Sequence, residues 1–272
     1  MKNKFLKSLV ILSAGYAFIE NRFILKIRHE NSGKNGQNDI KIAHISDLHR
    51  RRFGENNSRI CRIMEQEKPD IILITGDIIS RTEENISGIK IFLENLRKTA
   101  PVFLICGNHE QSLPEKFRNE FTEIVRKSGI NLLENDSVSL EIKNRNLIIY
   151  GLKESYGVYK NGDSYRNLEK ITPEIMGNLL GKIPENKLIL LMAHNPFFAD
   201  AYSGWGADYT FSGHVHGGII RIFGKGILSP ERKLFPEYSK GIYKIGKMNL
   251  CVSGGLGKFR LFNPPEIVIY KI

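Results

Sequence analysis

Short apolar segments alternate with amphipathic ones through the first half of this 272-residue chain. Apolar runs that suit buried strands occur at 40–45, 70–75 and 101–106, and segments with helical periodicity occur at 58–67, 83–98 and 114–128. Helical segments of this length between strands imply crossover connections, which join parallel neighbours in a sheet. The alternation therefore predicts an α/β fold with a largely parallel sheet.

The second half of the chain has a different pattern. Strand-like runs follow at 146–150, 188–192 and 209–212, and after His216 there are only short β-like pieces, at 219–223, 241–245, 250–253 and 266–270. A sandwich of two mixed sheets accommodates both halves.

Side chains that commonly bind metals stand directly after the predicted strands. They are Asp47 and His49, Asp77, Asn108, His194, and His214 with His216. Ligand sites in open α/β sheets form beyond the carboxyl ends of the strands, so five strand ends deliver these residues to one edge. Carboxylate and amide oxygens mixed with imidazole nitrogens suit divalent cations of intermediate softness.

Seven ligating side chains are too many for one tetrahedral metal and suit two metals that share a carboxylate. Asp77 has two oxygens and can bridge them. Asp47 and His49 are two residues apart, a spacing that places both on one face of an extended strand end. Two such metals lower the pKa of a bound water toward neutrality and offset charge on phosphoryl oxygens. The pattern therefore predicts a metal-dependent hydrolase.

The order of the motifs DLH, GD, GNHE, H and GHVH resembles the calcineurin-like metallophosphoesterases from about Ile40 to the C-terminus. The GHVHGG element and the ending at 259–266 resemble the bacterial membrane-associated phosphodiesterase branch. The resemblance implies a four-layer α/β/β/α sandwich of two mixed sheets. It also implies one metal bound by Asp47, His49, Asp77 and His216, and a second bound by Asp77, Asn108, His194 and His214. His109 is then no ligand, but lies near the leaving group as a general acid or an oxyanion stabiliser.

Departures from that branch affect the substrate more than the chemistry. Ile219 stands where related chains often have Gln, and Gly254 where they often have Arg. Three positively charged side chains are candidates for substrate binding, namely Arg50, Arg52 and Arg260. For each there is a plainer alternative, because a run of charge is usually a solvated loop and Arg260 can simply pack near the C-terminus.

Two features of the expected centre stay open. The mixed ligands suit Mn²⁺, Fe or Zn²⁺ and do not separate them. Glu110 either orients Asn108 or His109 from behind, or is an N-cap or a surface carboxylate.

The N-terminal segment 1–29 is expected to be a hydrophobic anchor or signal anchor, followed by a polar linker at 30–39 and the catalytic domain at 40–272. Its apolar run, 9–19, is shorter than the ~20 residues of a spanning helix, and no small-x-small cleavage site follows. The alternative is an amphipathic or buried helix. Basic residues flank both sides of the run, so the membrane face stays open.

The net charge of +11 fits an anionic membrane surface, a phosphorylated substrate or nucleic acid. Nucleic acid is not expected as a partner, because no separate basic and aromatic surface is visible. The three cysteines, Cys61, Cys106 and Cys251, have no close spacing and are expected to be buried thiols without a disulfide framework.

These observations predict a dinuclear metal-dependent phosphoesterase, specifically a phosphodiesterase, attached to the cell membrane by a single N-terminal anchor. Its substrate is expected to be an anionic phosphate ester, such as a lipid or cell-envelope component. The alternatives are a pyrophosphatase of the UDP-2,3-diacylglucosamine type, a DNA nuclease, and a non-catalytic module that binds the cell envelope. The physiological substrate and the oligomeric state are left open.

Overall fold

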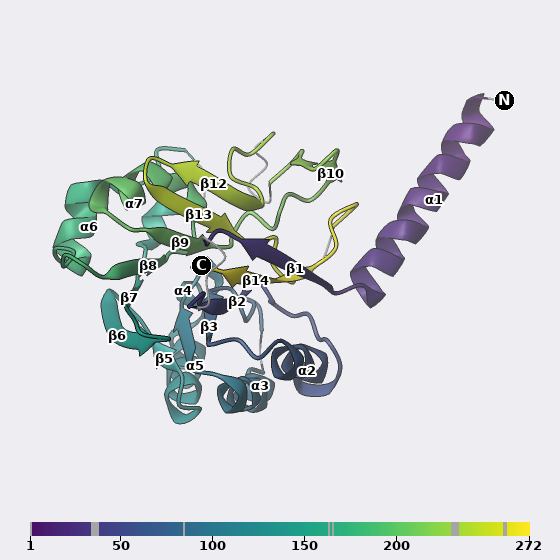
Figure 1. Ribbon diagram of the computed structural model, residues 1–272. Helices are drawn as coiled ribbons and strands as arrows, with labels where there is room; N and C mark the ends of the chain where they lie inside the picture. Colours follow the sequence, from purple (N-terminus) through teal and green to yellow (C-terminus); the bar gives the residue numbers. More distant parts are fainter. Residues whose placement is uncertain are drawn as a thin grey trace.

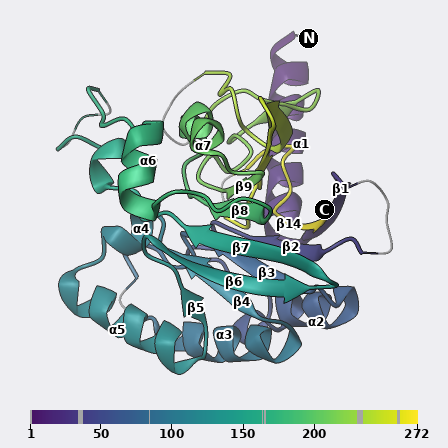
Figure 2. The ribbon, with the colours of Figure 1, turned by 60° about the vertical axis from the view of Figure 1, so that its left-hand side comes forward.

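Two six-stranded sheets pack face to face, and helices cover the outer face of each (Figures 1 and 2). The computed structural model of the chain describes residues 2–33, 38–83, 85–162, 164, 166–229, 234–257 and 260–272. This is the predicted four-layer α/β/β/α arrangement, so the predicted fold class is confirmed.

The first sheet carries the parallel strands of the N-terminal half. Its order is β1 (Lys26–Asn31), β14 (Glu266–Lys271), β2 (Lys41–Ile45), β3 (Ile71–Thr75), β4 (Val102–Ile105) and β5 (Asn131–Leu132). The last four are parallel to one another, whereas β14 is antiparallel to β2. Every residue of β3 is buried, because both faces of the sheet are covered, and this is why the run has no polar alternation.

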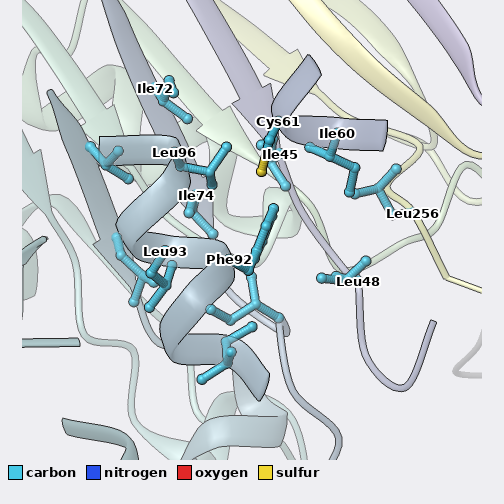
Figure 3. Packing of buried hydrophobic residues seen from close by; sticks show 14 of the residues in the cluster. Ile45, Leu48, Ile60, Cys61, Ile72, Ile74, Phe92, Leu93, Leu96 and Leu256 are labelled. Atoms are coloured by element: carbon cyan, nitrogen blue, oxygen red, sulfur yellow. The ribbon is translucent and has the colours of Figure 1, made fainter. Parts of the chain in front are cut away.

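Three helices cover the outer face of the first sheet: α2 (Ser58–Glu67), α3 (Ser87–Thr99) and α5 (Glu115–Lys127). Figure 3 shows apolar side chains of α2 and α3 packed on the strands, with Phe92 and Leu96 of α3 near Ile72 and Ile74 of β3. A short helix, α4 (Asn108–Gln111), begins just after β4. This layer supports the loops that leave the carboxyl ends of the strands.

The second sheet is mixed. Its order is β12 (Gly241–Ile245), β13 (Met248–Val252), β9 (Tyr209–Ser212), β8 (Leu188–Met192), β7 (Arg145–Gly151) and β6 (Asp136–Ile142). Helices α6 (Pro173–Leu180) and α7 (Ala199–Trp205) cover its outer face, and β10 (Arg221–Ile222) pairs with β11 (Lys225–Gly226) in a small hairpin. The strand predicted at 219–223 is thus reduced to two residues.

Each interface between layers has its own apolar core. Phe103 and Leu73 of the first sheet meet Met192 and Phe211 of the second in the middle of the molecule. The three cysteines are free: Cys61 and Cys251 are buried and Cys106 is partly buried. The expectation that no disulfide framework exists agrees with this.

The chain is ordered in the sheet before the predicted domain start at Ile40. After helix α1 (Lys2–Phe23), strand β1 pairs in parallel with β14 along its whole length, so the folded sheet begins at Lys26 and the predicted boundary of the anchor segment at residue 29 falls inside a strand. β1 is held by charge more than by apolar alternation, because Arg28 pairs with the buried Glu266 at 3.0 Å. That explains why the sequence pattern did not indicate it.

Among the residues that the structure describes, no helix combines the length and the apolar character needed to cross a membrane.

Candidate metal centre

Loops from both sheets bring the predicted ligands together. His194 Nε2 lies 3.4 Å from Asp77 Oδ2, and His216 Nε2 lies 3.6 Å from Asp47 Oδ1. His49 joins the two groups, since its Nε2 is 3.3 Å from His216 Nε2 and 3.9 Å from Asp77 Oδ2. Residues that follow β2 and β3 therefore meet residues that follow β8 and β9, as the strand-end rule predicts.

The two remaining predicted ligands border the same cluster. The ring of His214 lies 5.0 Å from that of His194, and its backbone N–H donates to Asp47 Oδ1 at 3.0 Å. Asn108 is buried at the start of α4, and the next backbone N–H, that of His109, donates to Asp77 Oδ1 at 2.8 Å. All seven side chains thus border one centre.

The chemistry of this centre fits bound cations. Asp47 Oδ2 and Asn108 Oδ1 are buried and have no hydrogen-bond partner within the described part of the chain. A buried oxygen without a partner is costly, and a cation satisfies it. Ligand atoms of Asp47, His49 and His216 lie within 4.8 Å of one another, and so do those of Asp47, Asp77 and His194. The division of the ligands between two metals stays a prediction.

The backbone at these ligands differs from the predicted extended geometry. Five of the seven have a positive φ: Asp47 (52°), His49 (51°), Asp77 (53°), His214 (67°) and His216 (55°). The pairs that are two residues apart therefore reach one centre from left-handed turns beyond the strand ends. Such conformations cost of order 1–3 kcal/mol each and cluster at functional sites.

Glycines make room for the buried carboxylates. A Cβ added at Gly213 or at Gly255 would lie 2.6 Å from Asp47 Oδ2. Gly255 also has a φ of +68°, so a side chain there meets both a steric and a conformational obstacle.

Glu110 joins the loops that carry Asp77 and Asn108. Its buried carboxylate accepts the backbone N–H groups of Asp77 at 2.8 Å, Gly107 at 2.8 Å and Ile79 at 3.1 Å. Burial, followed by the charge of Asp77, raises the pKa of Glu110 to about 7. Glu110 is therefore not a surface carboxylate: its bond from the N–H of Gly107 caps the start of α4, and the same carboxylate supports the ligand loops from behind.

His109 faces the centre with a defined tautomer. Its Nδ1 accepts the backbone N–H of Arg81 at 3.2 Å, so a neutral ring carries its proton on Nε2. Nε2 lies 4.0 Å from Asp77 Oδ2. Burial lowers the pKa of His109 to about 3, despite the attraction of Asp77. The ring is therefore a neutral donor at the edge of the cluster.

His194 is oriented for a metal by its other nitrogen. Nδ1 donates to the carbonyl oxygen of Thr75 at 2.6 Å, which leaves Nε2 directed at the centre. Burial disfavours a charged ring, but Asp77 and Asp47 outweigh it and raise the pKa of His194 to about 10. Binding of a cation at Nε2 must therefore displace a proton.

A second buried cluster, which the sequence did not indicate, packs behind His194 and His214. The ring of Tyr159 lies 5.9 Å from His194 and 5.0 Å from His214, and its hydroxyl donates to the buried carboxylate of Glu154. Tyr202 donates to the same carboxylate at 2.8 Å. Glu154 stands after strand β7, and this strand-end position is the signal that could have revealed it.

The three arginines proposed for substrate binding all line one cavity of about 730 Å³. Arg260 is buried, Arg50 is exposed, and Arg52 pairs with Glu83 at 2.7 Å. The structure thus brings them together, while their contact with a substrate stays a prediction.

Comparisons with known proteins agree with this geometry. Residues 40–218 match the family described as calcineurin-like phosphoesterase. The chain is 28% identical to an uncharacterized metallophosphoesterase of Aquifex aeolicus, over 97% of both chains. It is 26% identical to the phosphodiesterase YaeI of Escherichia coli, over 97% of this chain and 94% of that protein.

Two further similarities extend the comparison. The UDP-2,3-diacylglucosamine pyrophosphatase LpxG of Chlamydia muridarum is 26% identical, over 85% of this chain and 83% of that protein. The crystal structure of the phosphopantetheinyl hydrolase from Mycobacterium tuberculosis superposes with a TM-score of 0.52 at 15% identity, over 86% of this chain and 96% of that one. The similarity to this crystal structure supports the fold alone.

Proposed function

The chain belongs to the calcineurin-like phosphoesterase family and is a metal-dependent phosphoester hydrolase, and from this premise we propose that it is a phosphodiesterase with two divalent cations. The observation that carries the proposal is the cluster of ligands with two buried oxygens, Asp47 Oδ2 and Asn108 Oδ1, that lack hydrogen-bond partners among the described residues. A polar core built only for stability pairs such atoms.

In this proposal the seven ligands are divided between two cations. Asp47, His49, Asp77 and His216 hold one cation, and Asp77, Asn108, His194 and His214 hold the other. Two cations in such a site, when bound, activate water at neutral pH and offset charge on the phosphoryl oxygens. Mn²⁺, Fe and Zn²⁺ all suit the mixed oxygen and nitrogen donors.

His109 stabilises the departing oxygen in this proposal. Its neutral ring carries the proton on Nε2, at the edge of the ligand cluster. Because burial lowers the pKa of His109 to about 3, its ring is not protonated on both nitrogens at neutral pH. We therefore favour a hydrogen bond from Nε2–H to the leaving oxygen over full transfer of a proton.

The substrate that we propose is an anionic phosphodiester of a lipid or cell-envelope component. The net charge of +11 and the arginine-lined cavity favour such a substrate. The similarity to LpxG supports a second candidate, a pyrophosphatase that acts on a nucleotide-linked lipid. A non-catalytic envelope-binding module is disfavoured, because no predicted ligand is missing.

We also propose that α1 attaches the protein to a membrane surface. The helix exposes the apolar side chains of Leu12, Phe18, Ile19 and Phe23. Exposed apolar side chains on an interfacial helix insert at the boundary of head groups and acyl chains. Flotation of the full chain with anionic vesicles, compared with a Phe18→Glu variant, tests this attachment; equal flotation of both would contradict it.

The catalytic proposal is tested with metal-free protein to which Mn²⁺ or Zn²⁺ is returned. Bis(p-nitrophenyl) phosphate is expected to be hydrolysed faster than p-nitrophenyl phosphate, and a chelator is expected to abolish both activities. Release of UMP from UDP-2,3-diacylglucosamine at a higher kcat/KM than the aryl diester would favour the second candidate. Hydrolysis of the monoester alone would contradict both.

A further inference from the structure

A cavity of about 730 Å³ lies between helix α1 and the loops around the metal centre. One part of its lining is strongly basic and consists of Arg22, Arg50, Arg51, Arg52 and Arg260. No acidic residue is among the described residues that line it. The volume is within the range of about 300–1,000 Å³ that is usual for sites that bind small molecules.

The basic part of the cavity adjoins the metal centre. Arg51 donates to the carbonyl oxygen of Gly257 at 3.2 Å, and a Cβ on Gly257 would lie 3.0 Å from the ring of His216. Arg260 interacts electrostatically with Asp47. An anion beside these arginines is therefore next to the ligands of the centre.

The other part of the lining is apolar and comes largely from α1. Ala14, Ala17 and Phe18 stand three and four residues apart, so they share one side of the helix. Ile219, Ile220 and Leu261 complete the apolar lining from the loops. The two alanines are small, and this leaves the cavity open along the helix.

Contacts hold α1 against the rim of the site. The ring of Tyr16 lies 5.2 Å from that of Phe262. Glu20 is fully buried, beside Arg260 and the backbone of Phe262. Arg59 donates to the carbonyl oxygen of Phe23 at 2.9 Å, and from there β1 joins the sheet. Figure 1 shows the helix running outward from the start of that strand.

We propose that α1 is a wall of the substrate site, and that the cavity binds an amphiphilic phosphoester. The phosphate group lies against the arginines beside the metal centre, and an alkyl or acyl chain lies along Ala14, Ala17 and Phe18. This inference rests on the proposed phosphodiesterase and names the class of its substrate. It gives Arg50, Arg52 and Arg260 one shared role, and it explains why a basic cavity has one apolar side.

Alkylphosphonates that cannot be hydrolysed test the cavity by calorimetry on the full, metal-loaded chain. Methyl-, butyl-, hexyl- and octylphosphonate are titrated below their micelle-forming concentrations. The affinity is expected to rise roughly two- to fourfold per added methylene, as burial of a chain requires. An affinity that does not depend on chain length would overturn the proposal.

Two variants separate the apolar part from the basic part. Ala17→Trp fills the cavity and is expected to lower the affinity for octylphosphonate at least tenfold, while the affinity for methylphosphonate stays the same. Leu12→Trp adds the same ring to α1 at a position outside the cavity lining and is expected to change neither affinity. Arg50→Glu is expected to lower the affinity for all four alkylphosphonates by a similar factor. Equal losses from Ala17→Trp and Leu12→Trp would also overturn the proposal.

The binding and hydrolysis measurements test the cavity and the proposed reaction independently. If the aryl diester is hydrolysed but the affinities ignore chain length, the cavity proposal is wrong and the phosphodiesterase stands. If chain length controls the affinity but no diester is hydrolysed, the cavity proposal holds and the proposed reaction is wrong.

Discussion

Glu110 accepts the backbone N–H of Asp77 at 2.8 Å, and the same oxygen accepts the N–H of Gly107 at 2.8 Å. One buried carboxylate thus joins the loop after β3 to the loop after β4. The two loops carry ligands for both metals of the proposed centre, so their relative position depends on a residue that need not touch a metal.

Replacement of Glu110 is expected to weaken metal binding. Glu110→Ala leaves three buried N–H groups without their acceptor, and we expect a loss of roughly 10–100-fold in metal affinity. Glu110→Gln keeps one acceptor oxygen, and its metal affinity is expected to lie between that of Glu110→Ala and that of the original chain. Metal titrations followed by mass spectrometry measure the effect. Unchanged affinity in Glu110→Ala would show that the loops hold their positions without it.

Replacement of Asp77 is expected to abolish turnover. Its carboxylate is buried between His49, His109 and His194, and it is the one predicted ligand of both metals. Asp77→Ala is expected to lose at least one metal equivalent and to lower kcat more than about a thousandfold. Asp136→Ala, at an exposed carboxylate on β6, is the matched control. Full metal content with retained activity in Asp77→Ala would refute a bridging role.

Replacement of His109 is expected to lower kcat while the metals stay bound. The loss for His109→Ala should be about 10²–10³-fold, as is typical when one hydrogen-bond donor to a developing negative charge is removed. The loss should be larger for a substrate with an alkoxide leaving group than for a nitrophenolate, which needs little stabilisation. If the variant instead lost a metal equivalent, His109 would be a ligand.

The charged cluster at Glu266 is expected to make the fold sensitive to acid. Burial alone would raise the pKa of Glu266, but Lys240 and Arg28 outweigh it and lower the pKa below its usual value of 4.5. The folded state therefore gains stability above pH ~4.5 and loses it as the pH falls through the lower, folded pKa. Lys240 lies 2.5 Å and Arg28 3.0 Å from the carboxylate, so loss of the charge leaves two partly buried cations without their partner.

Glu266→Gln measures this contribution. At pH 7 the variant is expected to be about 3–5 kcal/mol less stable in urea unfolding, the range for a buried pair that loses one partner. The difference between the two proteins should shrink below pH ~4.5, where the carboxyl of the original chain becomes protonated. A difference that stays constant down to pH 3 would contradict the assigned pKa direction.

The elements best predicted from the sequence are those buried on both sides or strongly amphipathic. Helix α2 and strands β8 and β9 begin and end where the sequence places them. Of the edge strands of the two large sheets, β12 was predicted with its observed bounds, whereas β1, β5 and β6 were missed. In β6 four of the seven residues are exposed, and β1, with the sequence KIRHEN, depends on pairing with a strand at the other end of the chain.

The site was predicted in part for the same reason. Strand ends in an α/β sheet converge whatever the loops do, so the positions of Asp47 and Asp77 follow from topology. Their left-handed backbone does not, because a positive φ is uncommon for any residue other than glycine, even though aspartate adopts it more often than most. The cavity beside α1 joins residues 14–22 to residues 260–261, and only the folded sheet brings these together.

Strand β14 lies between β1 and β2 in the first sheet, yet the ribosome makes it after every other strand that the structure describes. Until it emerges, β2 has an open edge and β1 has nothing to pair with, so α1 has no strand to tether it. Gly255, which leaves room for Asp47, is also among the late residues. The first sheet is therefore completed only after the last strand of the chain has been made.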